Sequence, residues 1–238
     1  MTKSSTPTER HYLDNVIAVI GCDGSGKSTL SSDLLSHIKE QRPAELIYLG
    51  QSSGNIGNWI KNLPIIGKSL NKFLKKKAKK AHGKKDTPPD MATVLVIYLL
   101  SKWRVHKFRK MLRLSRRGIA IITDRYPQAE VPGFYFDGTG LGALQTDSWL
   151  AKKLSIQEYK LYQWMASHKP ALVIRLNIDE ETAFSRKPDH KLEMLRKKIS
   201  VIPELHFNHA QILDLSSLKP YAEVLEEAIN GVEKSLIQ

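Results

Sequence analysis

The chain has 238 residues, of which 41% are apolar and 26% are charged, and its formal net charge is +13 at pH 7. This length suits one α/β domain with a large core, and the single cysteine excludes an internal disulfide and a cysteine-rich zinc site. No apolar run is long enough to span a bilayer and no secretory signal pattern is present, so we expect a cytoplasmic protein.

Short apolar runs alternate with longer helical patterns along the chain. The runs that predict strands are residues 16–20, 46–49, 119–123, 171–178 and 211–215. The helical patterns cover residues 27–41, 89–117, 150–167, 179–195 and 220–237. Strands that are apolar on both faces and separated by helices are typical of a parallel sheet between two helical layers. We therefore predict an α/β fold, a three-layer sandwich around a five-stranded parallel sheet.

A phosphate-binding pattern follows the first predicted strand. The segment Gly21-Cys22-Asp23-Gly24-Ser25-Gly26-Lys27-Ser28 matches G-x-x-x-x-G-K-[ST] in full and opens the first predicted helix. Glycines let backbone N–H groups turn toward a phosphate, and the helix N-terminus adds a partial positive charge. Lys27 would bridge the β- and γ-phosphates, and the Ser28 hydroxyl would bind Mg²⁺. The residues expected to hold ATP are Gly21, Asp23, Gly24, Ser25, Gly26, Lys27, Ser28 and Thr29.

A second candidate site lies where Asp124, Arg125 and Tyr126 follow the third predicted strand. Ligands of doubly wound sheets bind at the carboxyl ends of the strands. Asp124 could orient Mg²⁺ or an acceptor there, and Arg125 could hold an anion through two hydrogen bonds. The alternative is that Asp124 only caps the turn that follows it.

Together these segments resemble the thymidylate kinase family of nucleoside monophosphate kinases. The resemblance rests on the GCDGSGKST loop, the basic helix that ends at Gly118, and the Thr123-Asp124-Arg125-Tyr126 block. The chain is also similar to thymidylate kinase-like proteins found beside bacterial surface-polysaccharide genes. We accordingly expect a flexible tail at residues 1–14 and a single P-loop kinase domain at 15–238. A basic insertion at about 54–88 and a lid at about 183–200 would interrupt that domain.

The resemblance implies a role for each matching residue. The catalytic group would be Lys27, Asp124, Arg125 and, from the lid, Arg186. The acceptor would contact Asp23, Arg104, Arg125, Tyr126 and Lys187, and the magnesium ligands would be Ser28 and Asp124. Phosphoryl transfer depends on positioning and on positive charge around the moving group, which these cations would supply.

The predicted reaction is transfer of the γ-phosphoryl group of ATP to a small-molecule acceptor, with a nucleoside monophosphate as the first choice. Residues 127–140 do not carry the pattern with which the family reads thymine. A sugar or another non-nucleotide acceptor is therefore one alternative. A membrane-associated, nucleotide-dependent switch is the other.

The positive charge is concentrated in one stretch without any acid. It consists of Lys61, Lys68, Lys72, Lys75, Lys76, Lys77, Lys79, Lys80, Lys84 and Lys85. Residues 58–80 alternate lysine with apolar side chains, a pattern typical of a helix on an anionic membrane surface, here the inner face of the membrane. A funnel for an anionic acceptor and a solvated loop are the alternatives, and the absence of arginine disfavours nucleic acid.

Two further features of assembly and metal binding can be read from the sequence. The eight histidines have no metal-binding spacing, so Mg²⁺ carried by the nucleotide is the metal that the sequence implies. A homodimer is compatible with the sequence, although no motif specifies one.

Overall fold

The computed structural model describes residues 11–50, 91–131, 140–143 and 147–236. The strands are β1 (His11–Gly21), β2 (Ala44–Tyr48), β3 (Ala120–Asp124), β4 (His168–Asn177) and β5 (Gln211–Ser216). The helices are α1 (Lys27–Lys39), α4 (Met91–Ser115), α5 (Trp149–Ala166), α6 (Glu180–Arg186), α7 (Leu192–Val201) and α8 (Tyr221–Leu236). Two 3₁₀ turns, η2 (Leu141–Ala143) and η3 (Ile202–Glu204), complete the described part of the chain.

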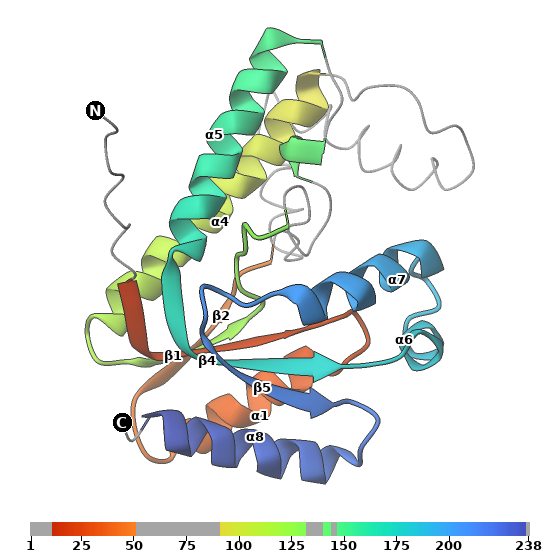
Figure 1. Cartoon of the computed structure of the whole chain (residues 1–238). Helices are drawn as coiled ribbons and strands as arrows, with labels where there is room; N and C mark the ends of the chain where they lie inside the picture. Colours follow the sequence, from red (N-terminus) through yellow and green to blue (C-terminus); the bar gives the residue numbers. More distant parts are fainter. Residues whose placement is uncertain (1–10, 51–90, 132–139, 144–146, 237–238) are drawn as a thin grey trace, which may run out of the picture.

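The five strands form one parallel sheet in the order β2-β3-β1-β4-β5 (Figure 1). The two faces of central strand β1 bury alternate side chains. Val16 and Ala18 join a core with α4, α5 and α7, whereas Ile17 and Val19 join a core with α1 and α8. Helices therefore cover both faces of the sheet, and the predicted three-layer α/β fold is confirmed.

Strand β1 begins earlier than the sequence indicates. The expected tail ended at residue 14, but His11 already pairs with His168 of β4, and the register shifts between Leu13 and Ile17. Asp14 and Asn15 interrupt the apolar run at this shift, which is why the sequence pattern begins only at Val16. The buried Asn15 amide donates to the carbonyl oxygens of Ser115 at 2.9 Å and Ile119 at 3.0 Å, so its polar group is satisfied inside the protein.

The predicted helix at residues 179–195 is wrong, because two helices lie in this region. Helix α6 ends at Arg186 and α7 begins at Leu192. Pro188 lies in the connection and disfavours a helical conformation at Lys187, whose backbone is at φ −139° and ψ 65°. The other predicted strands and helices are confirmed, with their ends shifted by a few residues.

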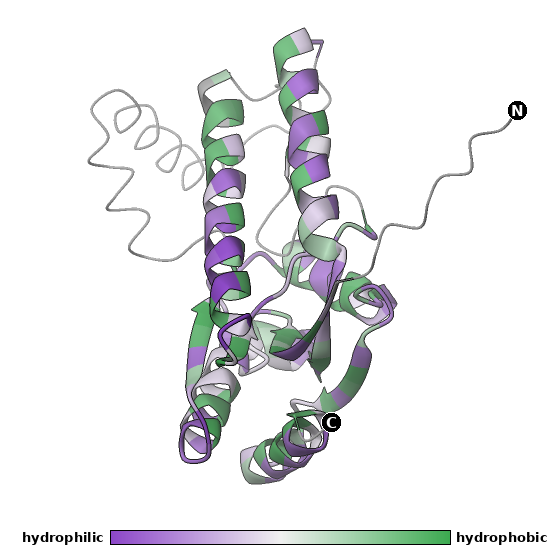
Figure 2. Ribbon diagram, turned by 90° about the vertical axis from the view of Figure 1, so that its left-hand side faces the viewer, coloured by the Kyte–Doolittle hydropathy of each residue, from purple (hydrophilic) through white to green (hydrophobic). Residues whose placement is uncertain are grey.

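Helices α4 and α5 form a two-helix arm that extends beyond the sheet (Figures 1 and 2). At its outer end the Ser148 hydroxyl donates to the sulfur of Met91 at 3.6 Å, and farther in Arg104 donates to the Tyr162 hydroxyl at 3.2 Å. Contacts thus advance along both helices in the same direction, so the helices are parallel and their N-terminal ends meet at the tip of the arm.

Some of the sequence predictions fall outside the described residues. These are the tail up to residue 10, most of the region 127–140, and the basic insertion with all ten of its lysines. Among the helices that the structure does describe, none combines the length and the apolar character needed to cross a bilayer.

Candidate active site

The loop between β1 and α1 has the backbone conformation that a phosphate-binding loop requires. Gly24 and Gly26 lie at φ +88° and +87°, in the left-handed region that residues with a Cβ rarely adopt. Gly26 caps α1 without a side-chain hydrogen bond to the first turn. Since the first N–H groups of a helix have no partners within it, this end of α1 offers donors and a partial positive charge to an anion.

Lys27 places its ammonium group inside this loop. The side chain is buried, and Nζ donates to the carbonyl oxygen of Cys22 at 2.6 Å. Burial, together with the nearby Arg125 guanidinium, lowers the pKa of Lys27 to about 8. A buried ammonium group beside another cation is stabilised when a negatively charged ligand binds next to it.

A carboxylate and a hydroxyl meet across the loop. The Ser28 hydroxyl donates to Oδ2 of Asp124 at 2.8 Å, because β3 ends beside β1 and directs Asp124 toward the start of α1. Oδ1 of Asp124 is buried and has no hydrogen-bond partner among the described residues. Two adjacent hard oxygen ligands, one of them with spare acceptor capacity, fit a Mg²⁺ ion that keeps several waters.

Arg125 is held in an uncommon backbone conformation at the end of β3. Its φ is +73°, and its N–H donates to the carbonyl oxygen of Val19 at 2.8 Å. The guanidinium donates to Oδ1 of Asp23 at 3.1 Å and lies 5.5 Å from the ring centroid of Tyr48. Strain of this kind is typical of functional sites, and here it turns a cation toward the phosphate-binding loop.

Asp23 ties the loop to the lid. Lys198 of α7 donates to its Oδ2, and His190 of the α6–α7 connection lies 3.9 Å from the same oxygen. Burial acts to raise the pKa of Asp23, but the charges of Lys198, Lys27 and Arg125 outweigh it, and the pKa is lowered. Asp23 is therefore a carboxylate anchored by cations from three parts of the chain.

The lid contacts the loop through a second cation, Arg186 at the end of α6. Its guanidinium donates to the carbonyl oxygens of Gly24 and Ser217, each at 3.2 Å. An added Cβ at Gly24 would lie 3.2 Å from the carbonyl oxygen of Ala183, so a larger residue would push α6 away by a few tenths of an ångström. Lys187 follows directly on the loop side of the lid.

These elements enclose a pocket of about 560 Å³. Its lining residues are Asp23, Gly24, Gly26, Lys27, Ser28, Thr29, Tyr48, Asp124, Arg125, Arg186, Lys187 and His190. The loop, the end of β3 and the lid, which are far apart in the sequence, thus converge on one site.

The structure separates two predicted acceptor residues from this pocket. Tyr126 is buried in the core, where its hydroxyl donates to the carbonyl oxygen of His168 at 2.9 Å and burial raises its pKa. Arg104 is fully buried in the arm, against Tyr162 of α5. Neither side chain is among the described residues that line this pocket, so the pocket does not support the acceptor contacts predicted for them. Gly21 and Ser25 belong to the same loop but are not among the described residues that line the pocket.

Sequence reasoning missed Tyr48, His190 and Lys198. Tyr48 ends β2, the strand next to β3, so strand order alone could have suggested it. His190 lies within the predicted lid sequence but was not singled out. Lys198 is one of several lysines on α7, and no sequence signal distinguishes it from exposed Lys197.

The chain is similar to two proteins of Escherichia coli K12 over nearly its full length. It is 53% identical over 221 residues to the uncharacterized ATP-binding protein YghS, with 93% of each chain covered. It is 42% identical over 229 residues to the uncharacterized ATP-binding protein YghR, with 96% of this chain and 91% of that protein covered. No protein-family model matches the chain.

A solved structure with lower sequence identity supports the fold. It is the deoxyadenosine kinase from M. mycoides with the products dCMP and a flexible dCDP bound, 15% identical to this chain. The match has a TM-score of 0.54 and covers 92% of this chain and 99% of that chain. The fold is therefore that of a P-loop kinase.

Proposed function

The chain belongs to the family of YghS and YghR, and from this premise we propose that it binds ATP and transfers the γ-phosphoryl group to a small-molecule acceptor. The observation that carries the proposal is the convergence of Lys27, the Ser28–Asp124 pair, Arg125 and Arg186 on one pocket. The names of the two relatives support ATP as the nucleotide.

Each group in the pocket suits a step of phosphoryl transfer. The backbone donors at the start of α1 and the Lys27 ammonium would bind the phosphate chain. Ser28 and Asp124 would hold Mg²⁺, which when bound neutralises charge on the phosphate oxygens. Arg125 would bind the acceptor or the transferred group, because its guanidinium is aimed into the pocket by the fixed backbone of β3.

The lid would exclude water from the reaction. Arg186 and Lys187 lie on the loop side of α6 and bring positive charge to the position of the γ-phosphate. Excluding water matters because water competes with the acceptor for the phosphoryl group. The ties from Arg186 to Gly24 and from Lys198 to Asp23 hold the lid against the loop.

A nucleoside monophosphate is our first choice of acceptor, because the chain resembles the thymidylate kinase family in its motifs and because Arg125, Arg186 and Lys187 bring positive charge to the pocket. A non-nucleotide acceptor is the second candidate. It is favoured by the burial of Arg104 and Tyr126, since the two residues that the thymidylate kinase resemblance assigns to the acceptor lie away from the pocket.

The two candidates are distinguished by measuring ADP release from Mg·ATP with each nucleoside monophosphate in turn, against a reaction without acceptor. A panel of sugars and sugar phosphates is measured in parallel. Stimulation by one nucleoside monophosphate supports the first candidate. Silence across the nucleotides with stimulation by a sugar supports the second.

Silence across both panels, with ATP bound, would contradict the proposed transfer and favour a nucleotide-dependent switch. Lys27→Met is the matched control for every positive result, because it removes the buried ammonium while keeping an unbranched side chain. We expect it to lower ADP release by at least about 100-fold.

A further inference from the structure

The two-helix arm has an unusual distribution of charge. Its charged residues are Lys102, Arg104, Lys107, Arg109, Lys110, Arg113, Lys152, Lys153, Lys160 and Glu158. Glu158 is fully buried, where it accepts hydrogen bonds from the Ser101 hydroxyl and the Leu141 N–H, each at 2.5 Å. Every ionised group on the exposed faces of α4 and α5 is therefore a cation.

Large apolar side chains are exposed on the outer half of the same arm. Trp149 is 72% exposed and Ile156 is 59% exposed, and they alternate with lysines along the outer face of α5. Leu95 and Leu99 are exposed on the outer half of α4. Figure 2 shows the apolar character of α4 toward the tip and its hydrophilic character toward the sheet. Cations combined with exposed aromatic and aliphatic side chains are typical of helices that lie at a membrane surface.

The tip adds a second electrostatic feature. Both helices have their N-terminal ends there, and neither has an acidic residue in its first turn. Lys152 and Lys153 instead place two cations close to the N-terminus of α5, where the helix dipole disfavours them. An anionic surface at the tip would be attracted to the lysines and to both helix dipoles.

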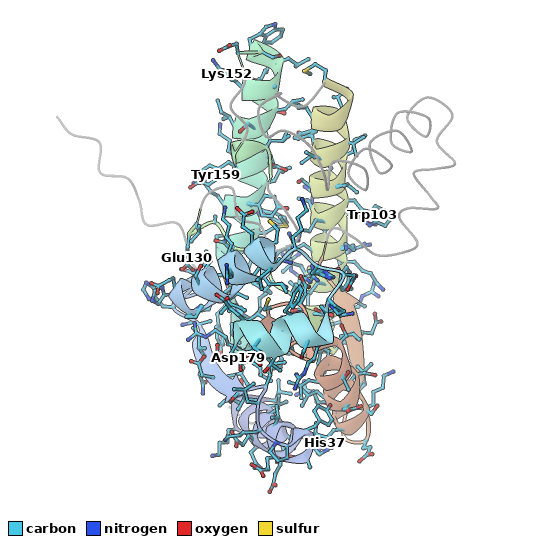
Figure 3. The ribbon with its side chains drawn as sticks, turned by 90° about the vertical axis from the view of Figure 1, so that its right-hand side faces the viewer. His37, Trp103, Glu130, Lys152, Tyr159 and Asp179 are labelled. Atoms are coloured by element: carbon cyan, nitrogen blue, oxygen red, sulfur yellow. The ribbon has the colours of Figure 1, made fainter. Side chains whose placement is uncertain are left out.

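The opposite end of the molecule has the opposite charge. Helix α8 carries four glutamates, Glu223, Glu226, Glu227 and Glu233, against Lys234. Figure 1 shows α8 and the arm on opposite sides of the sheet, and Figure 3 shows Lys152 and His37 of α1 at opposite ends of the molecule. A negatively charged surface would therefore orient the molecule with the arm toward it and α8 away from it.

Two partners other than a membrane, a second copy of the chain and nucleic acid, fit the charge and the exposed apolar side chains of the arm less well. A second copy docked tip to tip would bring the lysines of α5 together, against one described acid at the tip, Asp147, which directly precedes the N-cap of α5. Nucleic acid would pair with the lysines but would leave Ile156, Leu95 and Leu99 exposed to water. We propose that the tip of the arm docks on an anionic lipid bilayer, with Trp149 and Ile156 at the headgroup boundary and the lysines against the lipid phosphates.

The full-length protein is tested by co-sedimentation with vesicles of phosphatidylcholine, with and without phosphatidylglycerol. The double variant Lys152→Glu/Lys153→Glu should lose at least about tenfold in binding to the anionic vesicles. The matched control, Lys39→Glu/Lys234→Glu, makes the same charge change at the other end of the molecule and should bind as the unchanged protein does. All four lysines are exposed, so the fold is retained in both variants, as circular dichroism checks.

A second measurement reports on the apolar contact. Brominated lipids should quench the tryptophan fluorescence of the unchanged protein on anionic vesicles, and Trp149→Phe should remove most of this quenching. Equal vesicle binding by the Lys152→Glu/Lys153→Glu variant and its control would overturn the proposal. So would equal binding to neutral vesicles, binding to duplex DNA in place of vesicles, or a dimer that only the arm variants abolish. ADP release in solution should be the same in all these variants, so failure here leaves the proposed kinase function standing.

Discussion

At the scale of single residues, the site is defined by charges that the fold holds close together. Asp23 accepts from Arg125 on one oxygen and from Lys198 on the other. Burial, and then the charge of Arg125, lower the pKa of Lys27 to about 8. The sequence could predict Lys27, Asp124 and Arg125, because each lies in a short motif. It could not predict Lys198, because that contact joins residues 175 positions apart.

Lys107 is a cation for which the structure predicts a measurable pH dependence. It lies on α4, 5.0 Å from the ring centroid of Tyr48, and donates to the carbonyl oxygen of Gly50. Burial, and then the charges of Arg104 and Arg125, lower its pKa to about 7. The unfolded chain, with a lysine pKa of about 10.4, binds more protons than the folded protein between these values.

The free energy of unfolding therefore rises with pH above about 7 through this group. Lys107→Met lacks the effect, so we expect the variant to gain in stability relative to the unchanged protein near neutral pH. This advantage should shrink by about 1–3 kcal/mol as the pH is raised by two units. Urea unfolding of both proteins at the two pH values measures it, and a difference that does not change with pH would contradict the assignment.

At the scale of the elements, the lid is the part that the sequence described least well. The lysine and arginine residues of the lid were predicted, but as part of one helix, and the break at Pro188 redirects α7 so that Lys198 reaches Asp23. The proline was visible in the sequence. Its effect on the direction of α7 was not visible, because that direction depends on the packing of Leu195 into the core that β1 shares with α4 and α5.

Lys198→Met should loosen the lid from the phosphate-binding loop. We expect kcat/KM for phosphoryl transfer to fall by about 10- to 100-fold, because Asp23 and the lid cations would no longer be held in position. Lys198→Arg should restore most of the activity, since it can still donate to Asp23. Lys191→Met, an exposed position at the start of α7, is the control. Equal activity in the Lys198→Met and Lys191→Met variants would show that the tie does not matter.

The arm depends on a buried polar contact between its helices. Glu158 of α5 accepts from Ser101 of α4 and from the N–H of Leu141, and burial raises its pKa even though these partners and Arg104 oppose the shift. Glu158→Ala would remove the carboxylate that accepts from both donors and would leave a small cavity. We expect it to lower the free energy of unfolding by about 2–4 kcal/mol, measured by denaturant unfolding. Glu233→Ala on α8, where the side chain is partly exposed, should cost less than about 1 kcal/mol, and an equal loss in both variants would contradict this account.

At the scale of the whole molecule, the fold could be predicted because its periodicities are strong. Each of the five strands contains a short apolar run, and the apolar residues of β1 alternate between the two cores as a parallel sheet between helices requires. The separation of charge between the arm and α8 could not be predicted in the same way. The net charge directs attention to residues 46–85, whereas the exposed cations of α4 and α5 are recognised only once burial is known.

We propose that one pocket, formed by the loop, the end of β3 and the lid, transfers a phosphoryl group from ATP. The most direct measurement follows the label from [γ-³²P]ATP in a mixture of nucleoside monophosphates, sugars and sugar phosphates, with the unchanged protein and with Lys27→Met. We predict a labelled organic product that needs Mg²⁺ and that falls by at least about 100-fold in the variant. Label found only as inorganic phosphate, or a product formed equally by the variant, would contradict the claim.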